Sequence, residues 1–300
     1  MNKQKILIIG HNGLLSLSLQ KCFKQKNIHY VTTSRKISQF NALSFPCIPF
    51  DLEKTVTDQL KEINVKHFSH AIICGGIAKL AYCHHHPEKS RLINQIHTIH
   101  LCDFLLKNNI IPVYCSSDLV FDGNCGNYKE DDICHPLNEY GMQKRQVEEF
   151  LSKYLDQSLI LRFSKLYSIS QIDNSPIQEI FHKLSNNIPL HCAMNLAISP
   201  TNVDEICQAI SLLIQSRQTG LYHLSPGQAG KYNRYEFTMK FARLLKKTAL
   251  IHPCDLTDLQ LPFKLGNDNS LNSDKFCQQF NFEFSTFDQN FKNIWDFYKN

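Results

Sequence analysis

The first half of the chain alternates short apolar segments with amphipathic ones, and this alternation constrains the fold more than any other feature. Apolar segments typical of buried strands lie at 5–9, 29–33, 47–50, 68–74, 110–114 and 159–163. Segments with helical spacing lie between them, at 13–26, 55–63, 88–108 and 139–154. Strands that alternate with helices predict an α/β fold with a parallel, doubly wound sheet of the Rossmann type. Ligands bind such a sheet at the carboxyl ends of its strands.

The second half of the chain loses this alternation. Three segments there have helical spacing, at 175–187, 203–217 and 233–247. Asn233 followed by Glu236 has the spacing of a helix capping box, so we expect the last helix to begin there. The sequence thus predicts a first domain over 1–165 and a smaller C-terminal lobe over 166–300, with some later segments returning to the first domain.

Composition narrows the class of protein. Of the 300 residues, 43% are hydrophobic and 20% are charged, as in a soluble globular protein. The net charge of +5 is not gathered into a basic run, which argues against nucleic acid as a partner. No segment reaches the roughly 18 apolar residues of a membrane span, and the apolar stretch near the N-terminus is too short for a signal peptide. We therefore expect a cytoplasmic protein that binds neither nucleic acid nor a membrane.

The twelve cysteines are scattered along the chain, and no C-x-x-C pair occurs. We expect reduced thiols, many of them buried as small apolar side chains. Cys83-His84-His85-His86 is a cluster of metal-binding residue types, but adjacent histidines on a helix cannot all face one ion. We interpret this cluster as a solvated turn before Pro87 and predict no metal site.

The stretch GHNGLLS, residues 10–16, follows the first predicted strand. Gly10 and Gly13 permit a tight turn and a close approach of the backbone to a phosphate group, with Asn12 and Leu14 beside them as candidate cofactor-binding residues. Ser16 stands where the third glycine of a dinucleotide-binding fingerprint packs the helix on the sheet, so we expect it to space the helix slightly from the sheet. An ordinary strand-to-helix corner is the alternative.

The segment after the second predicted strand, Thr33-Ser34-Arg35-Lys36, contains no acid. NAD-binding sites often have an acid there for the ribose hydroxyls, whereas a cation suits the 2′-phosphate of NADP. The segment predicts NADP selectivity through Arg35, with help from Ser34 and Lys36. A solvated basic turn is the alternative.

Tyr140 and Lys144 are four residues apart in a predicted helix and share one face of it. A nearby ammonium group stabilises phenolate and lowers the pKa of a tyrosine, so such a pair is suited to give a proton to a carbonyl oxygen. Ser117 follows a strand and is a candidate to hydrogen-bond the same oxygen. The alternatives are an exposed helix face for the pair and a strand-end cap for Ser117. Together with the glycine turn, the three residues indicate a hydride-transfer site.

The stretch SSDLVFDGNCGNYKEDDICHPLNEYGMQK, residues 116–144, closely resembles a motif block of the extended short-chain dehydrogenase/reductases, and within them of the dTDP-4-dehydrorhamnose reductase group. Further segments resemble this family in the expected order: Phe50-Asp51-Leu52, LRFSKLYS at 161–168, SPTNVDEICQAI at 199–210 and GLYHLS at 220–225. The resemblance implies an NADPH-dependent oxidoreductase of carbohydrate biosynthesis, which reduces a keto group on a nucleotide-linked deoxysugar. The first domain is then the NADP-binding domain, and the C-terminal lobe mainly binds the substrate.

Matched by position, the family implies catalytic roles for Ser117, Tyr140 and Lys144. Tyr140 is then the proton donor, and Lys144 tunes it and binds the nicotinamide ribose, so that both also contact the cofactor. Arg35 would contact the 2′-phosphate. The resemblance further implies cofactor contacts from two later segments: Asp51, Leu52, Cys74, Gly75 and Gly76.

Two departures from the family concern the substrate. Leu119 and Lys165 replace aromatic residues at positions where the family meets its sugar, so the identity of the sugar stays open. Three functions remain: the reductase, a nucleotide-sugar epimerase or dehydratase, and a non-catalytic NADP-binding regulatory subunit that resembles the one of methionine adenosyltransferase. The turn at Arg35 argues against the second, and the presence of Tyr140 and Lys144 argues against the third. A homodimer also stays open, and no residues match the magnesium site of some relatives.

Overall fold

The structure is a computed structural model that describes residues 5–35, 46–61, 63, 67–169 and 176–299. The chain divides into two compact units. The first unit comprises Met1–Ser117, Asn138–Arg162 and Cys207–Tyr222, and the second comprises Asp118–Leu137, Phe163–Ile206 and His223–Asn300. The assignment of cofactor binding to residues 1–165 and of substrate binding to residues 166–300 stays a prediction.

A seven-stranded sheet organises the first unit, with the strand order β11-β6-β5-β4-β1-β2-β3. The pairs β1–β2, β1–β4, β2–β3, β4–β5 and β5–β6 are all parallel. The strand order changes direction at β1, and ligands bind open α/β sheets at this kind of switch point. The predicted doubly wound α/β fold is therefore confirmed. The strands are β1 (Lys5–Ile9), β2 (Tyr30–Ser34), β3 (Cys47–Pro49), β4 (Phe68–Ile73), β5 (Ile111–Cys115), β6 (Leu159–Arg162) and β11 (Gly220–His223).

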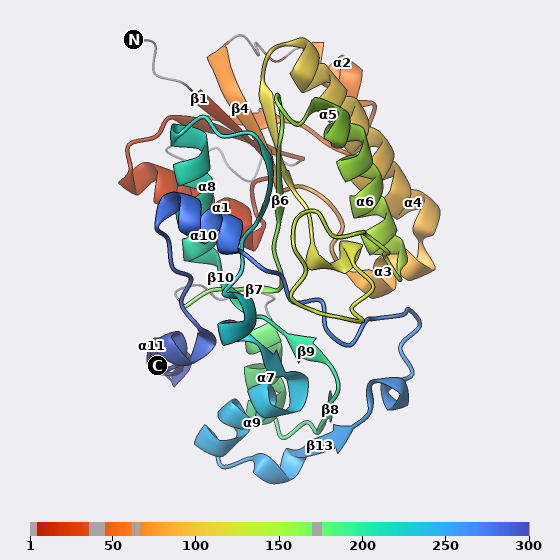
Figure 1. Cartoon of the computed structure of the whole chain (residues 1–300), viewed down its shortest axis with the longest axis vertical. Coiled ribbons are helices and arrows are strands. Elements are labelled where there is room, and N and C mark those ends of the chain that lie inside the picture. The colour runs from red at the N-terminus through yellow and green to blue at the C-terminus, as the bar shows by residue number, and fades with distance from the viewer. Residues whose placement is uncertain (1–4, 36–45, 62, 64–66, 170–175, 300) are drawn as a thin grey trace. The chain divides into compact units, whose positions relative to one another are not determined.

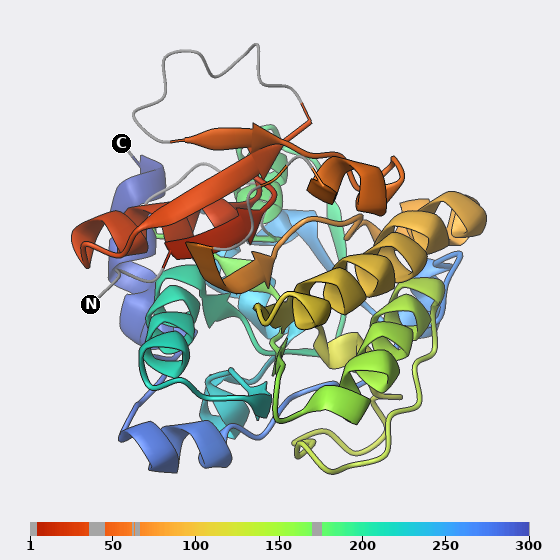
Figure 2. The same cartoon turned by 90° about the horizontal axis from the view of Figure 1, so that it is seen from above.

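Helices cover both faces of this sheet. Figures 1 and 2 show α5 and α6 on one face and α1 and α8 on the other. Both faces of the sheet are therefore buried, and Ile6, Leu7, Ile8 and Ile9 of the central strand β1 are each at most 1% exposed. The helices that belong wholly or mainly to this unit are α1 (Leu14–Gln25), α2 (Val56–Lys61), α3 (Leu80–His85), α4 (Pro87–Arg91), α5 (Thr98–Lys107), α6 (Glu139–Leu151) and α8 (Val203–Gln215).

One prediction of local structure is wrong, and another missed one feature of a helix. The Cys83–His86 segment is helical through His85, within α3, rather than a solvated turn, although its three histidines are exposed and Cys83 is buried. The long helix predicted over 88–108 is present as an unbroken run of α4, a π-helical segment at Leu92–His97 and α5, and only the π-helical segment was not predicted. π-helical turns inside α-helices are rare and frequently mark functional sites.

The second unit has its own apolar core, in which Phe237, Phe241 and Phe287 pack together. Asn233 caps α9 as predicted, because its side chain accepts a hydrogen bond of 2.7 Å from the backbone N–H of Glu236. The elements of this unit are β7 (Leu166–Tyr167), α7 (Pro176–Ser185), β8 (Leu190–Ala193), β9 (Ala197–Ile198), β10 (Thr201–Asn202), β12 (Tyr232–Asn233), α9 (Arg234–Leu244), β13 (Ile251–Cys254), α10 (Asp274–Phe280) and α11 (Phe287–Lys299).

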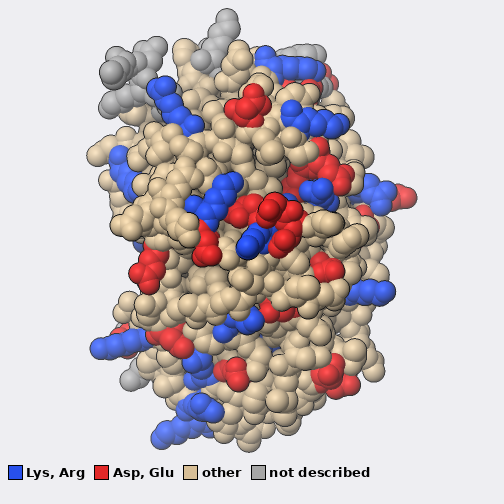
Figure 3. Space-filling view, in the orientation of Figure 1, with Lys and Arg blue, Asp and Glu red and all other residues tan. Residues whose placement is uncertain are grey.

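Among the described helices, none is long and apolar enough to cross a membrane. Charged side chains of both signs are interspersed on the face that Figure 3 shows. The described residues on that face therefore form no broad patch of one sign, in keeping with the scattered positive charge of the sequence.

Candidate active site

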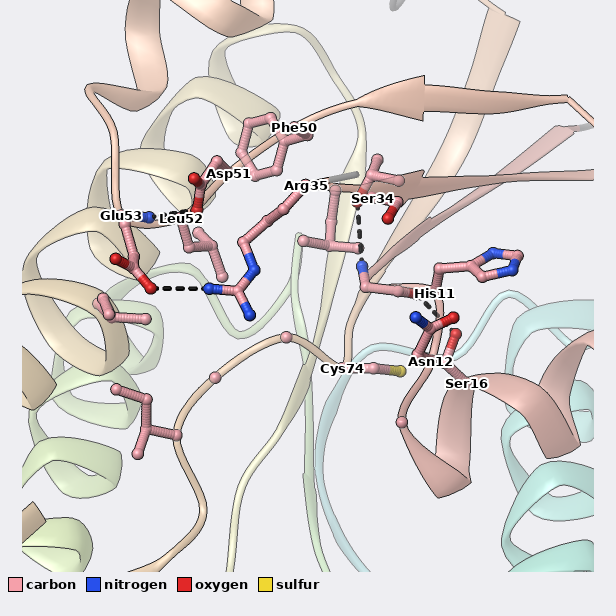
Figure 4. A pocket seen from close by; sticks show the side chains of 18 residues that line it. His11, Asn12, Ser16, Ser34, Arg35, Phe50, Asp51, Leu52, Glu53 and Cys74 are labelled. Atoms are coloured by element: carbon pink, nitrogen blue, oxygen red, sulfur yellow. Dashed lines mark hydrogen bonds and ion pairs between the residues drawn. The ribbon is translucent and has the colours of Figure 1, made fainter. Parts of the chain in front are cut away.

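A cavity of about 460 Å³ opens at the carboxyl ends of β1 and β2 and the loop that follows β4, all within the first unit (Figure 4). Ten of the predicted cofactor-binding residues line it: Gly10, Asn12, Gly13, Ser34, Arg35, Asp51, Leu52, Cys74, Gly75 and Gly76. Leu14, Tyr140 and Lys144 are not among the residues that line this cavity, and neither is Ser117. Lys36 lies outside the described residues.

Gly10 shapes the floor of the cavity. Its φ of +101° lies in the region that favours glycine, and a Cβ atom here would come within 3.2 Å of the backbone nitrogen of Gly75. Its N–H donates a hydrogen bond of 3.0 Å to the hydroxyl of Thr33 at the end of the next strand. A side chain at position 10 would therefore push apart the turn after β1 and the loop after β4.

Gly13 leaves open space at the start of α1. It is the residue that precedes the helix, with φ −74° and ψ 153°, and a Cβ atom built on it meets no atom within 4 Å. No side chain caps this helix, and its first turn contains no acid. A helix N-terminus with free N–H groups and no negative charge attracts phosphate, and the missing side chain leaves room for one. The turn thus fits the diphosphate of a dinucleotide.

Ser16 takes part in the turn through its hydroxyl group. The side chain is fully buried, and Oγ donates a hydrogen bond of 2.6 Å to the carbonyl oxygen of Gly10. Gln20, one helical turn later, donates to Ser16 Oγ at 3.3 Å and to the carbonyl of His11 at 3.0 Å. The residue that replaces the third glycine therefore ties the helix to the turn.

Arg35 has an acidic partner that the sequence analysis missed. One guanidinium nitrogen, Nη1, lies 2.7 Å from Oε1 of Glu53, and the second carboxylate oxygen lies 3.3 Å from Nζ of Lys89. Figure 4 shows the Arg35 side chain turned toward Glu53 along one side of the cavity. The sheet brings these residues together because the ends of β2 and β3 are paired, with Ser34 opposite Pro49.

Asn94 and Gln143 hold the loop after β4, and sequence reasoning missed both. Asn94 accepts a hydrogen bond of 2.8 Å from the N–H of Ile77 and donates one of 2.9 Å to the carbonyl of the same residue. Asn94 also donates to Gln143 at 2.7 Å, and Gln143 donates to Ser90 at 2.7 Å. Asn94 lies in the π-helical segment and Gln143 precedes Lys144 in α6, so this buried network joins the cavity wall to the helix that carries Tyr140.

Ser117, Tyr140 and Lys144 all belong to the first unit. Ser117 is 7% exposed and follows β5, whereas Tyr140 and Lys144 lie in the first two turns of α6. Asn138 caps this helix by accepting a hydrogen bond of 3.0 Å from Gly141. Lys144 Nζ lies 5.6 Å from the centroid of the Tyr140 ring, so the structure brings the two predicted partners together.

Lys144 is held in place on its other side by β5. Nζ donates a hydrogen bond of 2.7 Å to the carbonyl of Cys115 and lies 4.8 Å from the centroid of the Tyr114 ring. Burial lowers the pKa of Lys144, while the neighbouring Cys115 and Glu148 act in the opposite direction. The ammonium group is therefore fixed beside Tyr140 and at the end of β5, where Cys115 precedes Ser117 by two residues in the chain.

A buried ion pair supports the strand end that carries Ser117. Arg162 donates to both carboxylate oxygens of Glu148, from Nε at 2.9 Å and from Nη2 at 2.7 Å, and Ser116 donates to the same carboxylate at 2.5 Å. Arg162 and Glu148 are each 1% exposed. Removal of one partner would leave a buried charge uncompensated, so this network fixes β5, β6 and α6 relative to one another.

The second unit places two cations near each other. Lys165 precedes β7, and Arg234 is the first residue of α9. Burial and the positive charge of Arg234 lower the pKa of Lys165, although part of its side chain remains exposed. The negative charges of Asp118 and Glu179 raise the pKa of Lys165, but the Glu179 carboxylate lies 2.7 Å from Lys183. Leu119, the other departure from the family, lies in the short helix Asp118–Val120.

A parallel sheet with its switch point at β1, a glycine turn before α1 and a tyrosine–lysine pair in α6 together define an extended short-chain dehydrogenase/reductase. The chain belongs to the RmlD substrate binding domain family, whose model matches residues 4–299.

Two curated proteins illustrate the relationship. The chain is 27% identical over 251 residues to methionine adenosyltransferase 2 subunit beta of Xenopus laevis, covering 80% of this chain and 71% of that protein. It is 27% identical over 237 residues to dTDP-4-dehydrorhamnose reductase of Aggregatibacter actinomycetemcomitans, covering 78% and 73% of the two chains. The chain is therefore similar both to a reductase and to a subunit of an adenosyltransferase.

A solved structure extends the comparison to the fold. The dTDP-4-dehydrorhamnose reductase of Bacillus anthracis, crystallised in complex with NADP, superposes with a TM-score of 0.84. The alignment covers 99% of each chain at 19% identity. At this identity the match shows that the two chains share a fold.

Proposed function

We propose that this protein is an NADPH-dependent reductase of a keto group on a nucleotide-linked deoxysugar. The observation that carries the proposal is the fixed position of Lys144, 2.7 Å from the carbonyl of Cys115 and 5.6 Å from the Tyr140 ring. An ammonium group held beside a phenol stabilises the phenolate that remains after the phenol has given up its proton. A structural surface lysine would need neither this anchor nor this neighbour.

Residues 1–165 bind the cofactor in this proposal, and residues 166–300 mainly bind the sugar substrate. The turn with Gly10 and Gly13 holds the diphosphate, Arg35 meets the 2′-phosphate, and Asp51 and Leu52 line the adenine side. NADPH supplies the hydride. The family resemblance and the complex of the Bacillus anthracis enzyme with NADP support this choice of dinucleotide.

Tyr140 and Ser117 act on the keto oxygen. The Tyr140 hydroxyl donates its proton to that oxygen as negative charge develops there, and the Ser117 hydroxyl donates a second hydrogen bond that orients the carbonyl group. Lys144 keeps its positive charge throughout and stabilises the phenolate form of Tyr140. General acid catalysis of this kind contributes roughly 10²–10⁴-fold to the rate.

A regulatory role is the second candidate, because the relative from Xenopus laevis is a subunit of methionine adenosyltransferase. In that role the protein binds NADP without turning it over. The complete set of Ser117, Tyr140 and Lys144 favours the enzyme, since a binding subunit does not need a proton donor. An epimerase or dehydratase is less well supported, because Arg35 suits a phosphorylated dinucleotide that is released after each turnover.

Turnover separates these candidates. The purified protein is mixed with NADPH and a panel of nucleotide-linked 4-keto sugars, and the absorbance of the reduced nicotinamide is followed. The reductase predicts loss of absorbance with at least one sugar. Tight binding of NADPH without loss of absorbance for any sugar would favour the regulatory role, and NAD retained through purification would favour the epimerase.

A further inference from the structure

The cavity contains one acidic side chain that the proposed reaction does not use. Glu53 follows β3, and its N–H donates a hydrogen bond of 3.0 Å to Asp51 Oδ1, which fixes the turn that presents its carboxylate. That carboxylate is shared between Arg35 at 2.7 Å and Lys89 at 3.3 Å. Glu53 thus pairs with Arg35, which is the cation that the proposed function assigns to the 2′-phosphate.

The pair between Arg35 and Glu53 is easily broken. The side chains of Arg35, Glu53 and Lys89 are 65%, 38% and 52% exposed, so water and salt screen their attraction. Exposed ion pairs of this kind add little to stability. A phosphate dianion carries more charge than a carboxylate and accepts two hydrogen bonds from a guanidinium group, so it can displace Glu53 from Arg35.

Lys89 is a second ion-pair partner for the Glu53 carboxylate. When Arg35 turns to a phosphate, the Glu53 carboxylate still has the ammonium group of Lys89, which lies 3.3 Å from its other oxygen. The carboxylate nevertheless stays close to the bound phosphate, and the two negative charges repel each other. A dinucleotide without the 2′-phosphate leaves the pair of Arg35 and Glu53 intact and meets no such repulsion.

We propose that Glu53 is a specificity-determining residue that competes with the 2′-phosphate for Arg35 and so lowers the preference of this site for NADPH over NADH. Lys89 moderates the competition by holding Glu53 when Arg35 is engaged. This inference rests on the proposed dinucleotide site. It adds a residue that limits how strongly the site discriminates between NADPH and NADH.

Binding measurements test this without turnover. The dissociation constants of NADPH and NADH are measured by the fluorescence of the reduced nicotinamide for the wild type, Glu53→Gln and Lys89→Met. Glu53→Gln is expected to tighten NADPH about 3–10-fold and to change NADH less than about twofold, with a smaller gain at high salt. Lys89→Met is expected to weaken NADPH about twofold or more, because Glu53 then has only Arg35 as a partner.

Asp103→Asn is the matched control. Asp103 pairs with Lys107 at 2.7 Å on the surface of α5, outside the cavity, so its replacement changes net charge equally without touching Arg35. It should change both dissociation constants by less than about twofold. If Glu53→Gln changes the affinities for NADPH and NADH equally, or changes neither, the proposed role of Glu53 is overturned and the proposed function is not. A wild type that binds neither dinucleotide overturns the proposed function and this inference with it.

Discussion

The hydroxyl of Ser16 donates a hydrogen bond of 2.6 Å to the carbonyl oxygen of Gly10 and closes the turn between β1 and α1. The sequence predicts that a serine here only spaces the helix from the sheet. The structure shows in addition that the extra hydroxymethyl group satisfies a carbonyl oxygen of the turn. Serine in place of the third glycine therefore adds a polar contact to the turn between β1 and α1.

Ser16→Ala should lower the free energy of unfolding by about 1–2 kcal/mol, because it leaves the carbonyl of Gly10 without its partner. Urea unfolding measures the change. Ser152→Ala is the control, since the Ser152 hydroxyl donates to the carbonyl of Glu149 on the surface, and it should cost less than about 0.5 kcal/mol. Equal small effects of the two changes would show that the bond at Ser16 contributes nothing special.

His70 should make the protein sensitive to acid. It is 2% exposed in β4, its Nε2 has no hydrogen-bond partner in the described part of the chain, and burial lowers its pKa from 6.5 to about 4. The unfolded chain takes up a proton below pH 6.5 while the folded protein does not, so stability is lost as the pH falls from 6.5 toward 4. The gap corresponds to at most about 3 kcal/mol.

Urea unfolding at pH 7.5 and pH 4.5 measures this effect. In His70→Phe, the drop in unfolding free energy between the two pH values should be smaller than in the wild type by about 1–3 kcal/mol. His29→Asn, at an exposed site, should leave the drop unchanged. An undiminished drop in His70→Phe would mean that other groups cause the acid sensitivity.

Arg35→Ala should weaken NADPH about 10–100-fold and NADH less than about threefold, because a charge-assisted bond to the 2′-phosphate is lost. Titration calorimetry with both dinucleotides measures the difference. Arg91→Ala removes another surface arginine, which pairs with Glu139 at 3.2 Å, and should affect neither affinity by more than about twofold. Equal losses of NADPH and NADH would remove Arg35 from the phosphate site.

Lys165 should lose its proton more readily than an ordinary lysine. Burial and the charge of Arg234 both lower its pKa, so its reaction with acetic anhydride should reach half its maximum below pH 10.4. Mass spectrometry of the modified peptide, collected over a range of pH, gives the midpoint. Arg234→Gln should move the midpoint upward, and a midpoint that does not move would show that Arg234 has no influence on this lysine.

Local periodicity was sufficient to predict β1, α1, α6 and the spacing of Tyr140 and Lys144, because each depends on neighbours within a few residues. Glu53 was missed because its meeting with Arg35 depends on the pairing of β2 with β3, which no local pattern specifies. Asn94 and Gln143 are 49 residues apart and meet only when their helices pack.

The C-terminal helix was missed for a different reason. The segment that forms α11 is so rich in aromatic residues that its helical period does not stand out. The buried Phe287 and Ile294, with Phe291 between them, do have helical spacing, and α11 could have been predicted from it.

Transfer of deuterium tests the central claim most directly. The protein is incubated with NADPH labelled with deuterium at C4 of the nicotinamide, on one face and then on the other, and with nucleotide-linked 4-keto sugars. We predict that one of the two labelled forms delivers one deuterium to the former keto carbon, as mass spectrometry of the product shows. Tyr140→Phe should still bind NADPH and lose this transfer by about 10²–10⁴-fold in rate. A wild type that binds NADPH and yields no deuterated sugar from either form would contradict the assignment as a reductase.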